Sequence, residues 1–373
     1  MKINQWTMGL AAVGIVSLAS AVQAEESMNA VQTALSGTTI SGYVDTSLQW
    51  DNGDDYANFG GSIPFQNAGV TGDKTDGFNL NVVKLSLEKA MDESEWASGY
   101  KVDLLFGPDA VRYNPSINGD SDQDVGIKQA YVALRTPVGN GIDWKMGVFD
   151  TIVGYEVFES GSNPNFTRSY GYAIEPTQHT GLLGTYRISD TIAVAGGVAN
   201  TEYNGINDRD NNASDKTWLG SVAVTAPEDM GFLSGSTLYA GAVLGSGSNA
   251  NGPTANTQDN YYVGATLNTP VTGLKAGVAL DSVNADANSA LGEDAWSLAV
   301  YASFQASEKL SLHGRAEKID FSGGTGDILG LTATAQYDLW ANVISRAEVR
   351  YDDQDGANGQ DALGAFLNVI YVF

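Results

Sequence analysis

The sequence predicts an all-β protein, a closed antiparallel transmembrane barrel of about sixteen strands. Three observations support this prediction. From Thr39 to the last residue, Phe373, hydrophobic residues tend to recur at every second position, the period of a strand with one apolar and one polar face. Longer polar connections tend to alternate with short ones along the chain. All nine prolines fall in connections, as expected because proline cannot donate a hydrogen bond to a neighbouring strand.

The first strand, TISGYVDTSLQW at 39–50, places Ile40, Val44 and Leu48 on one face and Tyr43 and Asp45 on the other. The later strands are expected at 77–89, 98–107, 124–136, 142–149, 178–188, 191–202, 215–226, 235–245, 259–268, 273–284, 294–305, 309–320, 327–338, 341–352 and 361–373. Because lipid offers no hydrogen bonds, such a sheet must close on itself, with its last strand paired to its first. Long loops are then expected on the outer side and short turns on the periplasmic side.

A secreted β-sandwich, or a row of them, is the alternative. A sandwich would need polar outer faces, whereas one face is apolar along nearly every strand. Aromatic residues also stand near strand ends, as the girdles of a membrane barrel do. They are Trp50, Trp144, Tyr186, Trp296, Phe304, Tyr371 and Phe373. The barrel is therefore the preferred prediction.

The first 24 residues have the layout of a secretory signal: Lys2, an apolar run, and small residues up to Ala24. Cleavage is expected after Ala24; a buried N-terminal helix is the alternative. Residues 25–38 would form a short helix or a spacer, and 39–373 would form the barrel.

The overall charge excludes one class of partner. The chain has 44 acidic and 19 basic residues and no cysteine. Nucleic-acid binding needs clustered Lys and Arg, so it is not expected. An exported chain without cysteine takes no stability from disulfides.

The stretch TISGYVDTSLQW, and then DWKMGVFDTIVGYEVFESGSNPNFTRSYGYAIEPTQHTGLLGTYRISDTIAVAGGVAN at 143–200, resembles the OmpL-like β-barrel porins of the outer membrane. The likeness covers essentially the whole chain from about Thr39. It implies a channel in the outer membrane of a Gram-negative bacterium. It also implies that the C-terminus, with Tyr371 and Phe373, is an assembly signal for the barrel-insertion machinery. It supplies no catalytic or ligand-binding residues.

If the apolar face points to lipid, the other face lines a lumen. Its basic residues are Lys84, Lys101, Lys145, Arg187, Lys275, Arg315, Arg346 and Arg350. Its acidic residues are Asp45, Glu88, Asp103, Asp143, Asp281, Glu317 and Glu348. The two sets nearly balance, so the negative surplus must lie mostly in loops and turns. A wet wall of mixed charge is typical of a water-filled channel.

The segment 150–177 is too long and too aromatic for a simple hairpin cap, and we expect it to fold into the lumen. Opposite charges would then face each other across a narrow waist and bias ion passage. The predicted constriction residues are Arg315, Arg346 and Arg350 on two strands separated by one other, with Glu156, Glu159 and Arg168 on the loop. The alternative is a loop packed on the outer rim.

Catalysis and metal binding are not expected. The chain has two histidines, His179 and His313, which the strand assignment places far apart, and it has no G-x-S-x-G sequence. Two acidic clusters could hold a divalent cation or form a solvated surface, and the second reading is favoured. They are Asp51, Asp54 and Asp55, and Asp120, Asp122 and Asp124. The second cluster begins like a calcium loop, but Val125 and Tyr131 stand where Gly and Glu are required.

These features predict a passive porin for small hydrophilic solutes and ions, without a cofactor and with a mild cation preference. Its expected partners are outer-membrane lipid, lipopolysaccharide and the barrel-assembly machinery, and a homotrimer is open. An outer-membrane hydrolase and a non-conducting structural or adhesive barrel are the alternatives.

Overall fold

The computed structural model of the chain describes residues 37–51, 74, 76–113, 125–202, 205–209, 215–247, 256–286, 294–323, 327–355 and 359–373. The predicted signal 1–24, all but the last two residues of 25–38, and the side chains of both acidic clusters lie outside this description.

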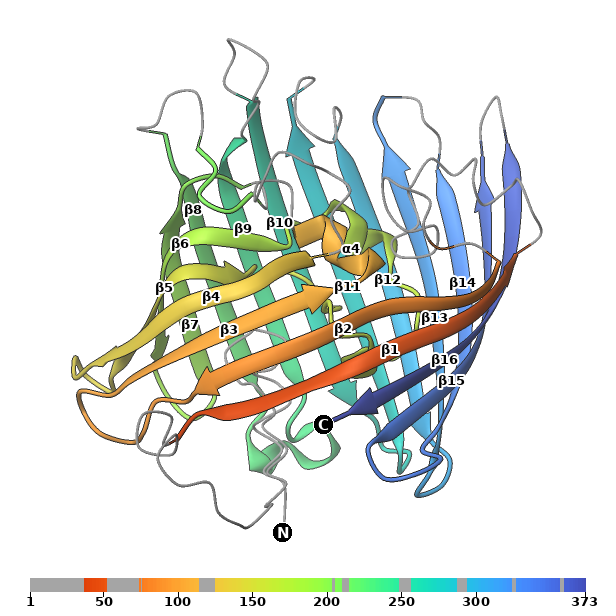
Figure 1. Ribbon diagram of the computed structural model, residues 1–373, viewed down its shortest axis with the longest axis horizontal. Helices are drawn as coiled ribbons and strands as arrows, with labels where there is room; N and C mark the ends of the chain where they lie inside the picture. The colour runs from red at the N-terminus through yellow and green to blue at the C-terminus, as the bar shows by residue number, and fades with distance from the viewer. Residues whose placement is uncertain are drawn as a thin grey trace.

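Sixteen strands form one closed barrel, in which each strand pairs antiparallel with its chain neighbours and β1 pairs with β16 (Figure 1). Their bounds are β1 (Thr39–Asp51), β2 (Gly77–Lys89), β3 (Ser98–Phe106), β4 (Val125–Thr136), β5 (Ile142–Asp150), β6 (Gln178–Arg187), β7 (Ile192–Ala199), β8 (Thr217–Thr225), β9 (Thr237–Gly247), β10 (Asn256–Asn268), β11 (Leu274–Ala285), β12 (Ala295–Gln305), β13 (Leu310–Phe321), β14 (Ile328–Tyr337), β15 (Val343–Gln354) and β16 (Gln360–Val372). Each predicted strand is present, with bounds that differ by three residues or fewer. The predicted fold class is confirmed.

The seam between β1 and β16 explains the apolar C-terminus. Gly42 and Phe373 exchange two backbone hydrogen bonds, each of 2.9 Å, so the last residue completes the closed ladder. A Cβ atom at Gly42 would lie 2.2 Å from the carbonyl oxygen of Lys84 and 2.7 Å from the ring of Phe373. Only glycine therefore fits at this point of the seam. On the outside, the side chains of Tyr371 and Phe373 are about half exposed.

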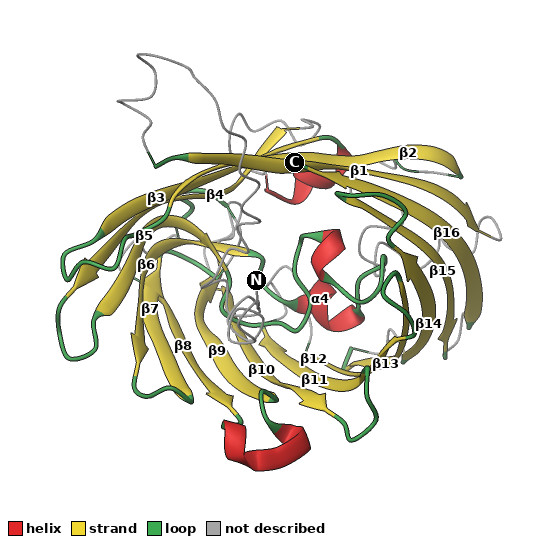
Figure 2. Ribbon diagram, turned by 90° about the horizontal axis from the view of Figure 1, so that it is seen from below, coloured by secondary structure: helices red, strands yellow, loops and turns green. Residues whose placement is uncertain are grey.

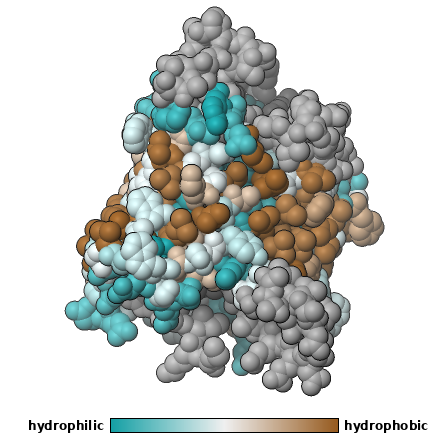
Figure 3. All heavy atoms as spheres, turned by 60° about the vertical axis from the view of Figure 1, so that its left-hand side comes forward, coloured by the Kyte–Doolittle hydropathy of each residue, from teal (hydrophilic) through white to brown (hydrophobic). Residues whose placement is uncertain are grey.

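The strands have an apolar outer face and a polar or tightly packed inner face. On β12, Trp296, Leu298 and Val300 are 38–47% exposed, whereas Ser297 and Tyr301 are buried. In Figure 3, hydrophobic residues cover the middle of the visible surface, with hydrophilic residues above and below. This arrangement suits hydrocarbon outside and polar groups inside. Of the described helices, none has the length and hydropathy needed to span a bilayer.

Two β-bulges interrupt the alternation of β2 and β4. The pairing of β1 with β2 shifts at Asn81, and that of β3 with β4 shifts at Lys128. At each bulge two consecutive residues face inward, because the extra residue changes the phase of the strand. Asn81 and Val82 are both buried, as are Lys128 and Gln129.

The short turns lie at the lower end of the barrel in Figure 1, and the strand ends that lead into the longer connections lie at the other end. In the described connections lie four short helices: η2 (Pro108–Tyr113), η3 (Ser160–Ser162), α4 (Tyr170–Ile174) and η4 (Glu228–Leu233). Figure 2, which looks into the barrel from below, shows α4 inside the ring of strands. The loop 151–177 thus lies within the lumen rather than on the rim.

Candidate functional site in the lumen

The loop 151–177 is buried against the inner wall through its apolar side chains. Tyr170 and Ile174 of α4 pack with Ile319 and Ile328 of the wall. Phe158 meets the ring of Tyr113 edge to face, with ring centroids 4.9 Å apart. Burial of this surface gives the loop a fixed place, since each large side chain removed from water contributes about 1.5–3 kcal/mol.

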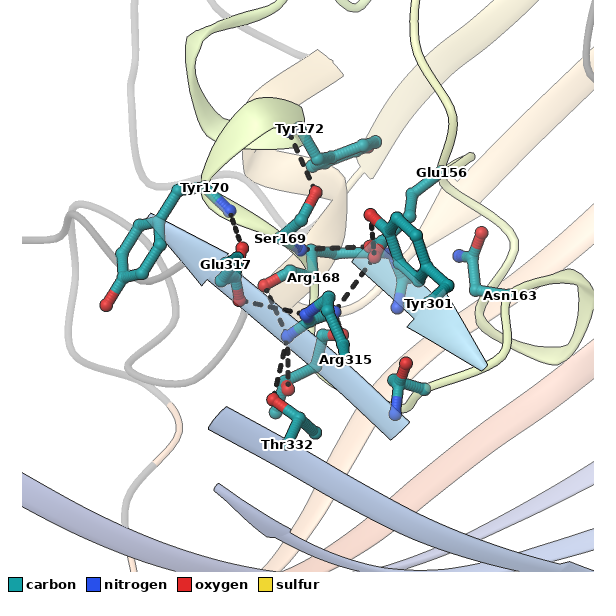
Figure 4. A network of polar contacts seen from close by, with 12 residues as sticks. Glu156, Asn163, Arg168, Ser169, Tyr170, Tyr172, Tyr301, Arg315, Glu317 and Thr332 are labelled. Atoms are coloured by element: carbon teal, nitrogen blue, oxygen red, sulfur yellow. Dashed lines mark hydrogen bonds and ion pairs between the residues drawn. The ribbon is translucent and has the colours of Figure 1, made fainter. Parts of the chain in front are cut away.

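Two arginines of the wall bind the loop backbone, and Figure 4 shows one of them, Arg315. Arg315 on β13 donates to the carbonyl oxygen of Thr167 at 2.7 Å and to that of Arg168 at 3.1 Å. Arg350 on β15 donates to the same Arg168 carbonyl at 2.6 Å. Loop carbonyls have no strand partner, and unpaired they would be costly in a buried place. The guanidinium groups supply the missing donors.

Carboxylates bind the backbone N–H groups of the same stretch. Glu348 accepts from the amides of Phe166 and Thr167 at 2.6 and 2.9 Å. Glu317 accepts from the amide of Tyr170 at 2.6 Å. Glu317 is also paired with a cation of the wall, since Arg315 Nε lies 2.8 Å from Glu317 Oε1. We call Arg315, Glu317, Glu348 and Arg350 the arginine clamp.

Glu156 of the loop completes the clamp. Its Oε1 lies 2.8 Å from Arg315 Nη1 and 3.1 Å from the hydroxyl of Tyr301, while its Oε2 accepts from the Ser169 amide at 3.0 Å. The side chains of Arg315 and Glu156 have no exposed area. Both oxygens of a buried carboxylate are therefore satisfied, as a stable buried ion pair requires.

The remaining arginines of the predicted constriction also bind the loop. Arg346 donates to the carbonyl oxygens of Ser160 and Asn165 at 2.9 and 3.2 Å. Arg168 turns back on its own loop and donates to the carbonyls of Val157 and Phe166 at 3.0 and 2.6 Å.

The sequence predicts that Arg315, Arg346 and Arg350 face the loop acids across an open lumen. In the structure these arginines touch the loop directly, so on this side there is no gap for a transverse field. The difference arises because backbone carbonyls of an inserted loop compete for guanidinium donors, and no sequence pattern reveals these acceptors.

On β2 and β4, two lysines of the wall hold one carboxylate of the loop. Lys84 Nζ on β2 contacts Glu159 Oε1, and Lys128 Nζ on β4 lies 3.3 Å from the same oxygen. We call Lys84 and Lys128 the lysine pair. Burial opposes ionisation of Glu159, but the ammonium groups of Lys128 and Lys84 outweigh it and hold the pKa of this carboxyl well below its usual range.

Each lysine of the pair also has a carboxylate of the wall. Lys84 Nζ lies 3.0 Å from Asp103 Oδ2, and Lys128 Nζ contacts Asp150 Oδ2. Lys128 was not among the predicted lumen residues, because strict alternation places it with Val132 and Leu134 on the lipid side. The bulge in β4 turns it inward.

A cavity of about 1390 Å³ lies between this wall, the loop and the short-turn end of the barrel. It begins at Thr39, Asp190 and Trp340, and it reaches the loop at Glu156 and Glu159. Lys84, Lys101 and Lys128 also line it. The described lining residues do not include Arg168, Arg315, Arg346 or Arg350.

The other predicted lumen residues are distributed along the wall. Lys101 Nζ lies 3.4 Å from Glu88 Oε2, and Lys145 Nζ lies 4.9 Å from the ring centre of Tyr131. Arg187 lines the cavity near its short-turn end, and Lys275 is exposed near the start of β11.

Among the described residues, the two histidines do not form a catalytic group. His179 Nε2 lies 3.1 Å from the hydroxyl of Thr151, and His313 Nδ1 lies 2.9 Å from that of Ser303. Within the described part of the chain, no three His, Asp or Glu residues are arranged to hold a metal ion.

Sequence comparison assigns the family. The family model described as "Putative beta-barrel porin-2, OmpL-like" matches residues 37–368. The chain belongs to this family. The resemblance noted in the sequence is thereby confirmed, and the family and the barrel together place this porin in the outer membrane of Gram-negative bacteria. No curated protein sequence matches the chain.

Several solved porins share the fold of this family member. OmpF of Salmonella typhi, in complex with daunomycin, superposes with a TM-score of 0.60 at 13% identity, covering 90% of this chain and 97% of that one. The anion-selective porin from Comamonas acidovorans gives a TM-score of 0.59 at 13% identity, with 90% and 99% covered. A trimer form of OmpT, an outer membrane protein of Vibrio cholerae, gives 0.58 at 14% identity, with 90% and 99% covered.

Proposed function

We propose that the protein is a passive porin, through which small hydrophilic solutes and ions diffuse across the outer membrane. One observation carries this proposal: a closed barrel with an apolar outer face encloses a cavity of about 1390 Å³ lined by charged side chains. Transport of this kind needs a hydrated path through the hydrocarbon, and the wall of the cavity supplies its polar surface.

We further propose that the loop 151–177 narrows this path and that the six predicted constriction residues divide into two roles. Arg315, Arg346, Arg350 and Arg168 position the loop through its backbone. Glu159 presents its carboxylate at the cavity, where Lys84, Lys101 and Lys128 of the wall also lie. The Glu156 carboxylate is fully buried and acts with the arginines, because it pairs with Arg315.

A mild cation preference follows from the charges of the cavity. Among its described lining residues, seven side chains are acidic and five are basic. Its lining therefore attracts cations more than anions, to a degree that falls as salt screens the charges.

Reconstitution in a planar bilayer tests the proposal directly. Stepwise current increases are expected, and the reversal potential in a salt gradient should have the sign of a weakly cation-selective pore. A protein that inserts fully yet gives no current would overturn the porin proposal in favour of a structural or adhesive barrel. Reversal to anion preference would overturn the assignment of the cavity charges.

We propose no catalytic activity. A hydrolase would need a base beside a nucleophile. Among the described residues, His179 lies beside the hydroxyl of Thr151 and His313 beside that of Ser303. Loss of a measured lipid or peptide hydrolysis on His179→Ala would favour the hydrolase instead.

Association into a homotrimer is proposed from the trimer form of the OmpT relative in fold. Contacts with lipid, with lipopolysaccharide and, through the C-terminal strand, with the barrel-assembly machinery are proposed from the exposed apolar face. Cross-linking in outer-membrane vesicles would test the trimer.

A further inference from the structure

The lysine pair and Glu159 form an unusual set of charges. Two ammonium groups from β2 and β4 converge on a single oxygen, Glu159 Oε1. This carboxylate belongs to the loop, whereas Asp103 and Asp150 belong to the wall. Glu159 is therefore a third carboxylate that approaches two lysines already paired with acids.

The wall carboxylate of Lys84, Asp103, is fixed more firmly than Glu159. Asp103 has no exposed area and accepts from the hydroxyl of Ser86 at 2.6 Å and from the amide of Gln129 at 2.9 Å. The Glu159 side chain is 23% exposed and borders the cavity. If Glu159 turned away, each lysine would keep a wall carboxylate, so departure would leave no buried charge unpaired.

The position of the loop does not depend on Glu159. The arginine clamp on β13 and β15 holds the backbone of 166–170, and Arg346 holds Ser160 and Asn165. The Glu159 carboxylate can therefore move while the loop stays in place.

A further hydrogen-bond donor of the same cavity has no partner among the described residues. Tyr43 lines the same cavity and is about nine-tenths buried, and its hydroxyl has no hydrogen-bond partner among the described residues. Lys101, 12% exposed, lies on the strand between those of the lysine pair. A buried hydroxyl without a partner is costly unless a solute or water binds it.

We propose that Lys84 and Lys128, with Lys101 and the Tyr43 hydroxyl, form an oxyanion-binding subsite of the lumen, and that Glu159 is its internal ligand. Small carboxylates and phosphates exchange with the Glu159 carboxylate as they pass. The proposal deepens the porin function and rests on it. Because the lysines keep their wall carboxylates, the subsite binds weakly, which transport requires, since a tightly bound solute would not leave.

Current recordings from single barrels with the probe inorganic phosphate test the proposal. In the wild-type protein, phosphate must compete with a tethered carboxylate at a high effective concentration. In Glu159→Gln this competitor is gone, so phosphate should block the current at a concentration lower by about tenfold. The reversal potential should also move towards anions. Succinate should act like phosphate, and glucose at the same concentration should not.

Asp190→Asn is the matched control, because it also removes one negative charge from the cavity lining but lies at the short-turn end. It should leave phosphate block within about twofold of the wild type, since charges beyond a Debye length are screened. Equal changes in both variants would overturn the subsite and leave only a general effect of charge.

Two further variants keep the test decisive. Adding Lys128→Met to Glu159→Gln should remove the gain in phosphate block, and persistence of the gain would overturn the proposal. If Glu159→Gln fails to assemble, Glu159→Asp keeps the charge and shortens the reach, so block should strengthen at unchanged net charge. A wild-type barrel that conducts but shows no effect in any variant overturns the subsite alone, whereas a wild-type barrel without current overturns the porin itself.

Discussion

The two attachments of the loop use the same chemistry in different surroundings. At the arginine clamp, the side chains of Arg315, Glu317 and Arg350 have no exposed area. At the lysine pair, Lys128 is nearly as buried, at 2% exposed, but Lys84 is 10% and Glu159 is 23% exposed. The clamp binds mainly backbone groups of several successive residues, whereas the lysine pair binds a single side chain.

This difference in burial decides what each attachment can do. A buried charge that loses its partner has no water to replace it, so breaking such a pair costs about 3–5 kcal/mol. An ion pair at a wet surface is screened by salt and is worth about 0–1 kcal/mol. The arginine clamp therefore fixes the loop, and the lysine pair can exchange ligands without moving it.

Arg315→Met should have the largest effect, because it leaves Glu156 and Glu317 buried without this cation and removes donors from two carbonyls. We expect a loss of about 3–5 kcal/mol at the clamp. The loop should then leave its place, and the single-channel conductance should rise and become noisy. Thermal unfolding and bilayer recording measure the two effects.

Arg135→Met provides the matched control. Arg135 Nε lies 2.6 Å from Asp143 Oδ1, but these side chains are 28% and 34% exposed. Loss of this pair should change stability by about 1 kcal/mol or less and leave the conductance as it was. If the two arginine variants behaved alike, burial would not be what distinguishes the attachments.

The sequence predicts the strands well and the contacts of the lumen only in part. The period of two identifies Lys84, Asp103, Glu317 and Glu348 as inward residues, because lipid on one side forces strict alternation. It misses Lys128, since a bulge is a change of phase that leaves no mark in composition.

The partners of the arginines could not be read from the sequence either. It suggests that the loop enters the lumen, since so many aromatic residues need burial. It cannot say that Arg315 and Arg350 would take the carbonyls of Thr167 and Arg168, because backbone acceptors are the same at every residue. The opposite charges of the side chains therefore suggested an electric field across an open lumen. In the structure, the arginines contact the loop directly.

Glu202, just beyond β7, is a third case for the comparison. Its carboxyl is buried, and among the described residues no cation stabilises its charge. Burial raises the pKa of this carboxyl to about 8. Below about pH 4.5 the group is protonated in both the folded and the unfolded state. As the pH rises towards 8, the unfolded state releases its proton and the folded state does not, so stability is lost with rising pH.

Glu202→Gln should therefore stabilise the protein at pH 9 and leave it unchanged at pH 4. The upper limit is about 5 kcal/mol for such a shift, and we expect about 1–3 kcal/mol, since the end of a strand can open locally. Thermal unfolding of both proteins at the two pH values measures the gain. A gain of equal size at pH 4 would mean that the amide acts through new hydrogen bonds rather than through the lost ionisation.

Lys128→Met should lower stability less than Arg315→Met does, by about 1–3 kcal/mol, because Glu159 keeps Lys84 and can turn towards water. Its effect on selectivity should be clearer, since Glu159 is then less neutralised and cation preference should rise about twofold.

Lys101→Met removes the same charge from the same cavity but leaves the contact between Lys84, Lys128 and Glu159 intact. Reversal potentials of the two variants separate the effect of contact from the effect of charge. If Lys101→Met shifted selectivity as far as Lys128→Met, the lysine pair would be no more than two charges among many, and the contrast with the arginine clamp would reduce to a difference in stability.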